Sequence, residues 1–389
     1  MKYFHFIPAA CIFLFCQCGG QDSHFLSDTK YIPVFSEDSC QYIDHGDNLH
    51  FTGAYSDASL FYDNMALICN QSDKKWGYID DSGELQYPAV YTRATIFNEN
   101  RAWVVRPDEA PCAIDTKGRL QLTLTRASKV MIFCEGMAAF AQKEKKGERW
   151  GFIDKSGTPV IKPLYKDVKP FSSGLAAVKN EQNLWGYIDS KGIERIPAQF
   201  SSAESFSKER HAVVRSAKSG LFQVIDTKGD TLWTIECDAL ISDGNTFRIK
   251  KDKKWGWCDN KGNIFIEPRF EDSESFGNPD LAPVKIRGKW GYINRKGEWK
   301  IKRQFSKAFP FFDGLAVVQT GTVYGNRPGR TFPNQSSIRP YFRRLHSSID
   351  QERLGIHTGR KRSRPIQIKP SQLISPPTNG QITLPERVS

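Results

Sequence analysis

The residues that come nearest to a chemical site are two histidines and their acidic neighbours close to the amino terminus. His45 and His50 lie near Asp44 and Asp47, with Cys40 a few residues upstream. These side chains are ordinary zinc ligands, so the cluster suggests a metal site. Its spacing fits no zinc-binding pattern, however, and it falls on a predicted turn. We interpret it as a solvated loop, and we expect no metal and no other cofactor.

No catalytic motif follows along the chain. The sequence contains no HExxH, P-loop, GxSxG or paired CxxC pattern. His211 stands where related segments have Leu, and we interpret it as a tolerated strand residue. We predict that the protein is not an enzyme. The alternative is a cell-envelope hydrolase or hydrolase inhibitor, which would need a carboxylate pair or metal cluster outside the turns described next.

Most of the regularly spaced acids belong to one tight turn. Asp189, Ser190, Lys191 and Gly192 show the pattern, with Asp first and Gly fourth. Aspartate at the first position can accept a hydrogen bond from the backbone two residues on, and glycine at the fourth tolerates positive φ. We therefore interpret these acids as turn-forming residues.

Each turn closes a phrase that begins with a Trp–Gly pair and continues with an aromatic residue and Ile. The phrase is complete at three places and has one change at two more, so that the structural repeat residues are Trp76, Gly77, Asp80, Trp150, Gly151, Asp154, Trp185, Gly186, Asp189, Trp255, Gly256, Asp259, Trp290 and Gly291. Three worn copies, closed by Asp44, Asp115 and Asp226, lack the pair. Successive turns lie 33 to 39 residues apart. A fixed period in this range predicts stacked supersecondary units.

Within each unit, apolar and polar residues alternate with a period of two, and proline ends the last predicted strand. The sequence therefore predicts an all-β tandem array of three-stranded β-meanders, with about eight repeats over residues 40–321. We favour an open, solenoid-like array. The alternative is a closed β-propeller, although propeller blades usually have four strands and about 40 to 45 residues.

The Trp–Gly phrases, preceded by Lys75, Lys254 and Lys289, resemble the WG-repeat family, also called KWG repeats. The resemblance covers roughly residues 40–320. It implies a β-rich interaction scaffold of the kind found in bacterial secreted and envelope proteins. It implies no shared catalytic residues.

The amino terminus indicates export. Residues 1–18 form a short apolar stretch after Lys2, which is typical of a secretory signal peptide, and residues 19–39 follow as a linker. Cys18, followed by Gly19 and Gly20, resembles the acylated cysteine of bacterial lipoproteins, although Phe15, Cys16 and Gln17 depart from that pattern. We expect a lipid anchor on Cys18 and a membrane-anchored protein of the cell envelope. The alternative is a periplasmic or secreted protein.

The carboxyl-terminal residues 322–389 break the pattern. They contain no Trp and are rich in Arg, Pro and Ser, so we predict a disordered tail. The codons for Glu352 to His357, shifted by one nucleotide, permit Asn-Gly-Trp-Gly-Tyr-Ile, which is the repeat phrase. We therefore predict a frameshift near residues 321–324, which the DNA sequence would test. A further alternative is that the frameshifted product has no function.

Most of the net positive charge of the chain lies in this tail. The tail has 12 Lys and Arg against 3 Asp and Glu, so it carries +9 of the formal +12 and leaves +3 elsewhere. We expect no nucleic-acid partner. Lysine pairs precede several of the Trp–Gly phrases, either as solvated turns or as a basic stripe along one side of the array. We predict a scaffold that presents this surface to an unknown protein or glycan partner.

Overall fold

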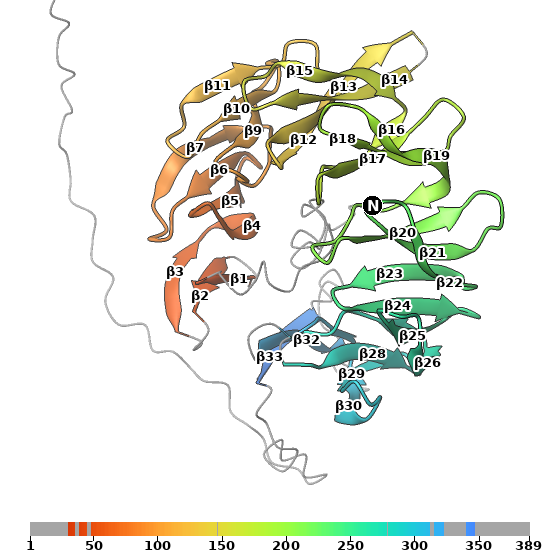
Figure 1. Ribbon diagram of the computed structural model, residues 1–389. Coiled ribbons are helices and arrows are strands. Elements are labelled where there is room, and N and C mark those ends of the chain that lie inside the picture. Colours follow the sequence, from red (N-terminus) through yellow and green to blue (C-terminus); the bar gives the residue numbers. More distant parts are fainter. Residues whose placement is uncertain are drawn as a thin grey trace, which may run out of the picture. The chain divides into compact units, whose positions relative to one another are not determined.

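The computed structural model describes residues 30–35, 39–44, 48–145, 147–277, 279–311, 315–322 and 340–346. In these residues all the regular secondary structure is β-strand (Figure 1). The all-β prediction is confirmed. The described part of the chain contains no helix that could span a membrane.

The strands form antiparallel meanders in which neighbours in sequence are neighbours in the sheet. Five sheets have four strands each: β4 (Tyr55–Tyr62), β5 (Met65–Asn70), β6 (Trp76–Ile79) and β7 (Leu85–Tyr91); β8 (Arg93–Ala94), β9 (Ala102–Val105), β10 (Cys112–Ile114) and β11 (Leu120–Thr123); β12 (Lys129–Cys134), β13 (Met137–Glu144), β14 (Gly147–Asp154) and β15 (Pro159–Tyr165); β23 (Ala239–Asp243), β24 (Thr246–Lys251), β25 (Lys254–Asp259) and β26 (Ile264–Phe270); β27 (Asp272–Ser273), β28 (Ala282–Ile286), β29 (Lys289–Ile293) and β30 (Trp299–Phe305).

Three further sheets complete the described chain. They consist of β1 (Ile32–Phe35), β2 (Cys40–Ile43) and β3 (Leu49–Gly53); β16 (Asp167–Val168), β17 (Leu175–Lys179), β18 (Trp185–Asp189), β19 (Glu194–Ala203), β20 (His211–Ser216), β21 (Phe222–Asp226) and β22 (Thr231–Ile235); and β31 (Lys307–Ala308), β32 (Leu315–Thr322) and β33 (Pro340–His346). The seven-stranded sheet joins two repeats because β19 pairs with β18 along one half and with β20 along the other.

Most repeats have a fourth strand that the sequence did not predict. It is the first strand of the unit and is often only two residues long, as in β16, which pairs with the end of β17. The sequence placed this segment in a linker loop because two residues give no period-two signal. A four-stranded antiparallel sheet packed face to face on the next one has the form of a β-propeller blade, the alternative named above.

Strands also occur beyond both expected boundaries of the repeat domain. β1 lies inside the predicted linker, and Tyr31 just before it is buried against the first two sheets. Within the region predicted to be a disordered tail, residues 340–346 instead form β33, which pairs with β32. A strand there satisfies backbone groups that β32 would otherwise leave unpaired. Residues 1–18 with Cys18, and the rest of the tail, lie outside the described residues.

The hydrophobic core lies between successive sheets. One cluster combines Trp150 and Phe152 of β14 with Phe171 and with Ala176 and Val178 of β17 in the following sheet. Equivalent clusters join other neighbouring sheets, and one joins the two repeats of the seven-stranded sheet. Each repeat therefore completes the core of its neighbour, which explains why the unit recurs at a fixed period.

Candidate interaction surface

The tryptophans of the repeat phrase are core residues. Trp150, Trp185 and Trp290 are buried, and Trp76 and Trp255 are half-buried. Each packs in a cluster between two neighbouring repeats. These rings are therefore not free to act as stacking platforms for sugars.

The glycine of each pair faces a backbone bulge on the next strand. In β18 and β19, Trp185 pairs with Phe200 and Tyr187 pairs with Ile196, so an advance of two residues along β18 corresponds to four residues along β19. The same two-against-four register occurs at every other Trp–Gly pair. A Cβ on Gly186 would lie 2.7 Å from the carbonyl oxygen of Ile196. Only glycine leaves room for the bulge.

The worn repeats have neither the glycine nor this bulge. Gln223 of β21 occupies the position of Gly186, and it pairs directly with Thr234 in a straight ladder from Phe222 to Val224. Cys112 and Gln41 occupy the same position in the other two worn repeats and also pair without a shift. The Trp–Gly pair and the bulge therefore occur together.

The aromatic residue after the glycine ties the sheet to the following linker. The hydroxyl groups of Tyr78, Tyr187 and Tyr292 donate to carbonyl oxygens 17 residues further on, at 2.7, 2.7 and 2.8 Å. All three rings are buried. Burial raises the pKa of these phenols, so they remain protonated donors.

The recurring acids form the turns. In Asp189, Oδ1 accepts hydrogen bonds from the backbone N–H groups of Lys191 and Ile193, at 2.9 and 3.0 Å. Partial desolvation alone would raise the pKa of Asp189, but the hydrogen bonds from Ile193 and Arg195 outweigh it and lower the pKa. Asn294 makes the same two backbone contacts in the last Trp–Gly repeat.

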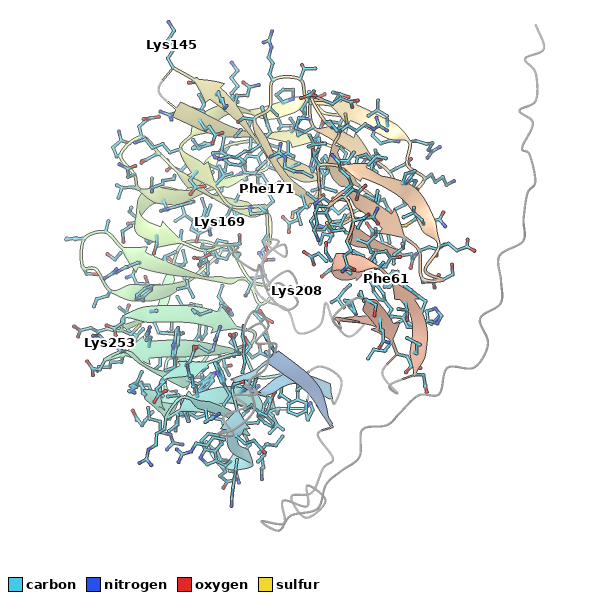
Figure 2. The ribbon with its side chains drawn as sticks, turned by 180° about the vertical axis from the view of Figure 1, so that it is seen from behind. Phe61, Lys145, Lys169, Phe171, Lys208 and Lys253 are labelled. Carbon is cyan, nitrogen blue, oxygen red and sulfur yellow. The ribbon has the colours of Figure 1, made fainter. Side chains whose placement is uncertain are left out.

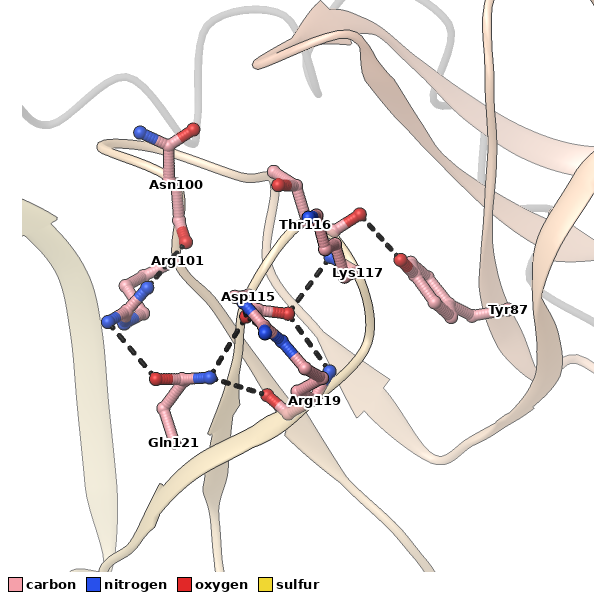
Figure 3. Close-up of polar contacts among 8 residues, drawn as sticks. All are labelled: Tyr87, Asn100, Arg101, Asp115, Thr116, Lys117, Arg119 and Gln121. Carbon is pink, nitrogen blue, oxygen red and sulfur yellow. Dashed lines mark hydrogen bonds and ion pairs between the residues drawn. The ribbon is translucent and has the colours of Figure 1, made fainter.

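Figure 3 shows the turn of a worn repeat in detail. Asp115 Oδ1 accepts from the backbone of Lys117 and Arg119, and its Oδ2 accepts from the Arg119 and Gln121 side chains. Tyr87 of the preceding repeat donates its hydroxyl to the Thr116 carbonyl oxygen at 2.6 Å. The carboxylate is thus fully engaged in the turn, and the turn itself is fixed to the neighbouring sheet.

The residues of the histidine cluster near the amino terminus contact different partners. His50 Nε2 lies 2.7 Å from the Asp81 carbonyl oxygen, and its ring stacks on Tyr31 at 3.9 Å. Asp44 accepts hydrogen bonds from Asn48. His45 and Asp47 lie outside the described residues. Among the residues that are described, no group of three or more His, Cys, Asp or Glu side chains is placed to hold a metal ion.

The sequence analysis missed a buried charge cluster between the sheets of β23–β26 and β27–β30. Arg248 is only 6% exposed, and its Nη1 donates to the Ser273 carbonyl oxygen and lies 3.4 Å from Glu274 Oε2. Burial raises the pKa of Asp243 and of Glu274, and the positive charge of Arg248 opposes both shifts. One indication of this cluster is present in the sequence: Arg248 occupies an inward-facing strand position that is occupied by Ala177 in β17. The cluster holds two sheets together.

His211 is the second polar residue buried in this region. Its Nε2 lies 3.4 Å from Ser242 Oγ, and its ring contacts Phe247 with 5.1 Å between the centroids. Burial lowers the pKa of the imidazole, so the ring is neutral at physiological pH. The distance to Ser242 is long for a nucleophile–base pair, and we assign His211 a packing role.

Exposed charges recur at both ends of the strands. The hairpin turns between the second and third strands of each sheet, here called the basic tips, carry more positive than negative exposed residues. The exposed bases in or beside these turns are Lys74, Arg106, Lys143, Lys145, Arg215, Lys218, Lys251, Lys253, Arg287 and Lys289, and the exposed acids are Asp73, Asp108, Glu109, Glu144, Glu181 and Asp252. Figure 2 shows Lys145 and Lys253 on outward-facing tips, whereas Lys208 lies at the other end of its repeat.

Neighbouring basic tips lie on the same side of the stack. Arg149, beside the tip of β13 and β14, forms an ion pair of 2.8 Å with Glu181 in the tip of β17 and β18. The opposite ends of the sheets also contact one another, since Glu135 accepts a hydrogen bond from the backbone of Gly174 in the following repeat. Positive charge therefore recurs in nearly every unit at the basic tips, whereas the turns at the other end combine a recurring acid with exposed lysines such as Lys117, Lys191, Lys228 and Lys261.

Five segments match the family model described as WG containing repeat, at residues 76–106, 150–183, 185–216, 255–290 and 290–324. Each match begins at a Trp–Gly pair. No curated protein sequence matches the chain.

Solved structures resemble the chain in fold at low sequence identity. A crystal structure of a eukaryotic initiation factor is similar over 74% of this chain and 86% of its own length, with 11% identity and a TM-score of 0.53. BamB from Moraxella catarrhalis is similar over 69% of this chain and 92% of its own, with 12% identity and a TM-score of 0.41. At these identities the likeness concerns the fold alone.

Proposed function

This chain is a WG-repeat protein, and from that premise we propose that it is a non-enzymatic scaffold that presents its repeat surface to a protein or glycan partner. The observation that carries the proposal is the row of basic tips. A residue type that recurs once per repeat lines up in space and forms an extended surface. Such a surface suits a partner that carries a row of negative charges, either an acidic glycan or an acidic protein face.

Two neighbouring tips form the densest part of this surface. The turn between β24 and β25 exposes Lys251 and Lys253, and the turn between β28 and β29 exposes Arg287 and Lys289. The exposed acids beside these bases are Asp238, Asp252 and Glu271, of which Asp238 and Glu271 accept hydrogen bonds from the backbone of the tips. Because the repeat tryptophans are occupied in the core, recognition of a glycan here would depend on its charge and not on ring stacking.

The test is binding to an acidic polysaccharide, with polygalacturonate as the probe and a neutral dextran as reference. We expect the full chain to bind polygalacturonate with an affinity that falls steeply as salt is added. Replacing Lys251, Lys253, Arg287 and Lys289 together by Ala should weaken binding at least tenfold. The matched control replaces four exposed turn lysines at the other end of the strands, Lys117, Lys191, Lys228 and Lys261, with the same change of charge.

Equal losses in both quadruple variants would show a non-specific charge effect and would contradict the proposal. Failure to bind polygalacturonate, together with retention on an acidic protein column that only the first variant loses, would identify a protein partner. Failure of both probes would remove the basic tips as the interaction surface.

We further propose that the scaffold is exported and held at the membrane through a lipid on Cys18. This rests on the sequence of residues 1–18, which lie outside the described part of the chain. A single acylated terminus would tether the repeats to a bilayer without inserting them. Labelling with radioactive palmitate in a bacterial host should mark the wild-type protein and not the Cys18→Ser variant. A labelled Cys18→Ser variant, or an unlabelled wild type in the soluble fraction, would contradict the anchor.

A further inference from the structure

The last strand of each repeat exposes an edge whose backbone groups could pair with another chain. In the Trp–Gly repeats this edge is interrupted by the bulge, and four of the five bulges contain a proline: Pro88, Pro163, Pro197 and Pro268. Bulges and prolines are the devices by which natural sheets prevent strands from adding to their edges. The intact repeats are therefore protected.

β22, the last strand of a worn repeat, lacks the proline and the wide bulge, and keeps only a one-residue shift at Leu232, between Trp233 and Thr231. Its ladder with β21 is straight from Ile235 to Trp233, and Thr231–Ile235 contains no proline. Threonine, tryptophan and isoleucine favour extended structure. The side chains of Thr231, Leu232 and Thr234 are exposed. In the described part of the chain, β22 ends its seven-stranded sheet, and its outer edge pairs with no other strand.

The following repeat holds β22 in place. Trp233 Nε1 donates to the Asn260 carbonyl oxygen at 2.9 Å, and its ring meets Phe247 edge-on at 5.0 Å. The turn glycine Gly262 also packs against this ring. An edge already fixed in extended form loses little conformational entropy when a segment pairs with it. The other two worn repeats end in β3 and β11, and neither strand has acidic residues directly at both ends.

Exposed acids lie beyond both ends of β22. Asp230 precedes the strand, and Glu236 and Asp238 follow it. If two copies paired antiparallel through this edge about Trp233, Asp230 of one copy would face Glu236 of the other. Like charges directly opposite one another destabilise a strand pair. The charges therefore disfavour a second copy and favour an added strand with basic residues at its ends.

We propose that β22 is a docking site for an extended segment of a partner protein, with basic residues flanking a β-forming core. The segment would add an eighth strand to the sheet, held by backbone hydrogen bonds and oriented by Asp230 and Glu236. The site borders the tip of β24 and β25 at one end, where Asp238 accepts a hydrogen bond from the backbone of Lys253, but it selects the opposite charge, so it goes beyond the scaffold function proposed above.

The experiment uses two fluorescein-labelled peptides with the core Thr-Val-Thr-Val-Thr, one flanked at each end by two lysines and the other by two glutamates. Fluorescence anisotropy with the full chain measures binding. We expect the lysine-flanked peptide to bind at least tenfold more tightly than the glutamate-flanked peptide. Amide hydrogen exchange of β22 should slow when the lysine-flanked peptide is bound.

Two double variants separate the β22 edge from general charge effects. Leu232→Lys with Thr234→Lys places two cations on the β22 edge and should weaken binding of the lysine-flanked peptide at least tenfold. Val90→Lys with Leu164→Lys adds the same charge at exposed positions on two bulged edges, β7 and β15, and should change binding less than twofold. Circular dichroism checks that both variants keep the fold.

Equal weakening in the two variants, or no binding of either peptide, would overturn the proposal. Equal binding of both peptides would overturn its charge selectivity. Concentration-dependent self-association that only the Leu232→Lys, Thr234→Lys variant abolishes would identify a second copy as the occupant, and this too would overturn it. Polygalacturonate binding by the Leu232→Lys, Thr234→Lys variant should stay within twofold of wild type, which separates a failure at β22 from a failure at the basic tips.

Discussion

The intact repeat around Trp185 and the worn repeat that follows it share one sheet but differ in how their third and fourth strands pair. In the first, Gly186 allows β19 to bulge, and Tyr187 donates a hydrogen bond to the linker. In the second, Gln223 and Val224 pair along a straight strand, and no tyrosine stands at that position. The backbone course of the last strand thus depends on the residue opposite it.

The residues that stabilise the repeats therefore differ from the residues that we assign to partner binding. The Trp–Gly phrase places bulky rings between sheets and a bulge on the outer strand, which stabilises the array and protects its edges. Where the phrase is worn, the sheet still forms, but its edge is open. The most recognisable residues in the sequence are therefore structural, and the surfaces that we assign to partners lie at the basic tips and at a repeat that the motif does not mark.

The largest expected effect comes from removing a core ring. Trp185→Ala should destabilise the chain by about 3–5 kcal/mol, because Trp185 is buried between two repeats. Phe222→Ala, at the equivalent worn position, should cost less because Phe222 is half-buried. Urea denaturation of both variants measures the contrast. Equal losses would show that the two repeats do not differ in how they use this position.

A smaller effect is expected from the tyrosine hydroxyl. Tyr187→Phe should destabilise the chain by about 1 kcal/mol, since it removes the hydrogen bond to the Glu204 carbonyl oxygen. Phenylalanine fits this position, as Phe152 shows in β14. The shift of the urea midpoint is the measurement. No shift would mean that the link from sheet to linker contributes nothing to stability.

The smallest effect should appear only in acid. The pKa of Asp189 is lower in the folded chain than in the unfolded chain, so its contribution is present above the unfolded pKa of about 4 and is lost as the pH falls through the folded pKa. Asp189→Asn should leave stability near neutral pH almost unchanged, because Asn294 makes the same turn. Thermal unfolding between about pH 6 and 2 should show a weaker pH dependence for the variant. An unchanged pH dependence would contradict the lowered pKa of Asp189.

Much of the fold could be predicted because its signals are local. The turn acids, the period-two strands and the repeat spacing each depend on neighbouring residues. The fourth strand was missed because β16 has only two residues. The bulge was missed because proline was taken as the end of a strand, whereas Pro197 lies inside β19.

The interaction surfaces were harder to predict because they depend on contacts between distant residues. The lysine pairs could be seen in the sequence, but their position on one side depends on how the sheets stack. Arg248 looked like an ordinary strand residue until the packing of two sheets enclosed it with Ser273 and Glu274. The open edge of β22 became visible only by comparison with the bulged edges.

The most direct test of the central claim compares Gly186→Ala with Gln223→Ala by urea denaturation. A Cβ on Gly186 would press on the backbone of Ile196 and Ala198, so we predict a loss of about 1–3 kcal/mol, although alanine usually stabilises a strand relative to glycine. Gln223→Ala should change the free energy of unfolding by no more than about 0.5 kcal/mol. Similar values for the two variants would contradict the claim that the Trp–Gly pair exists to accommodate the bulge.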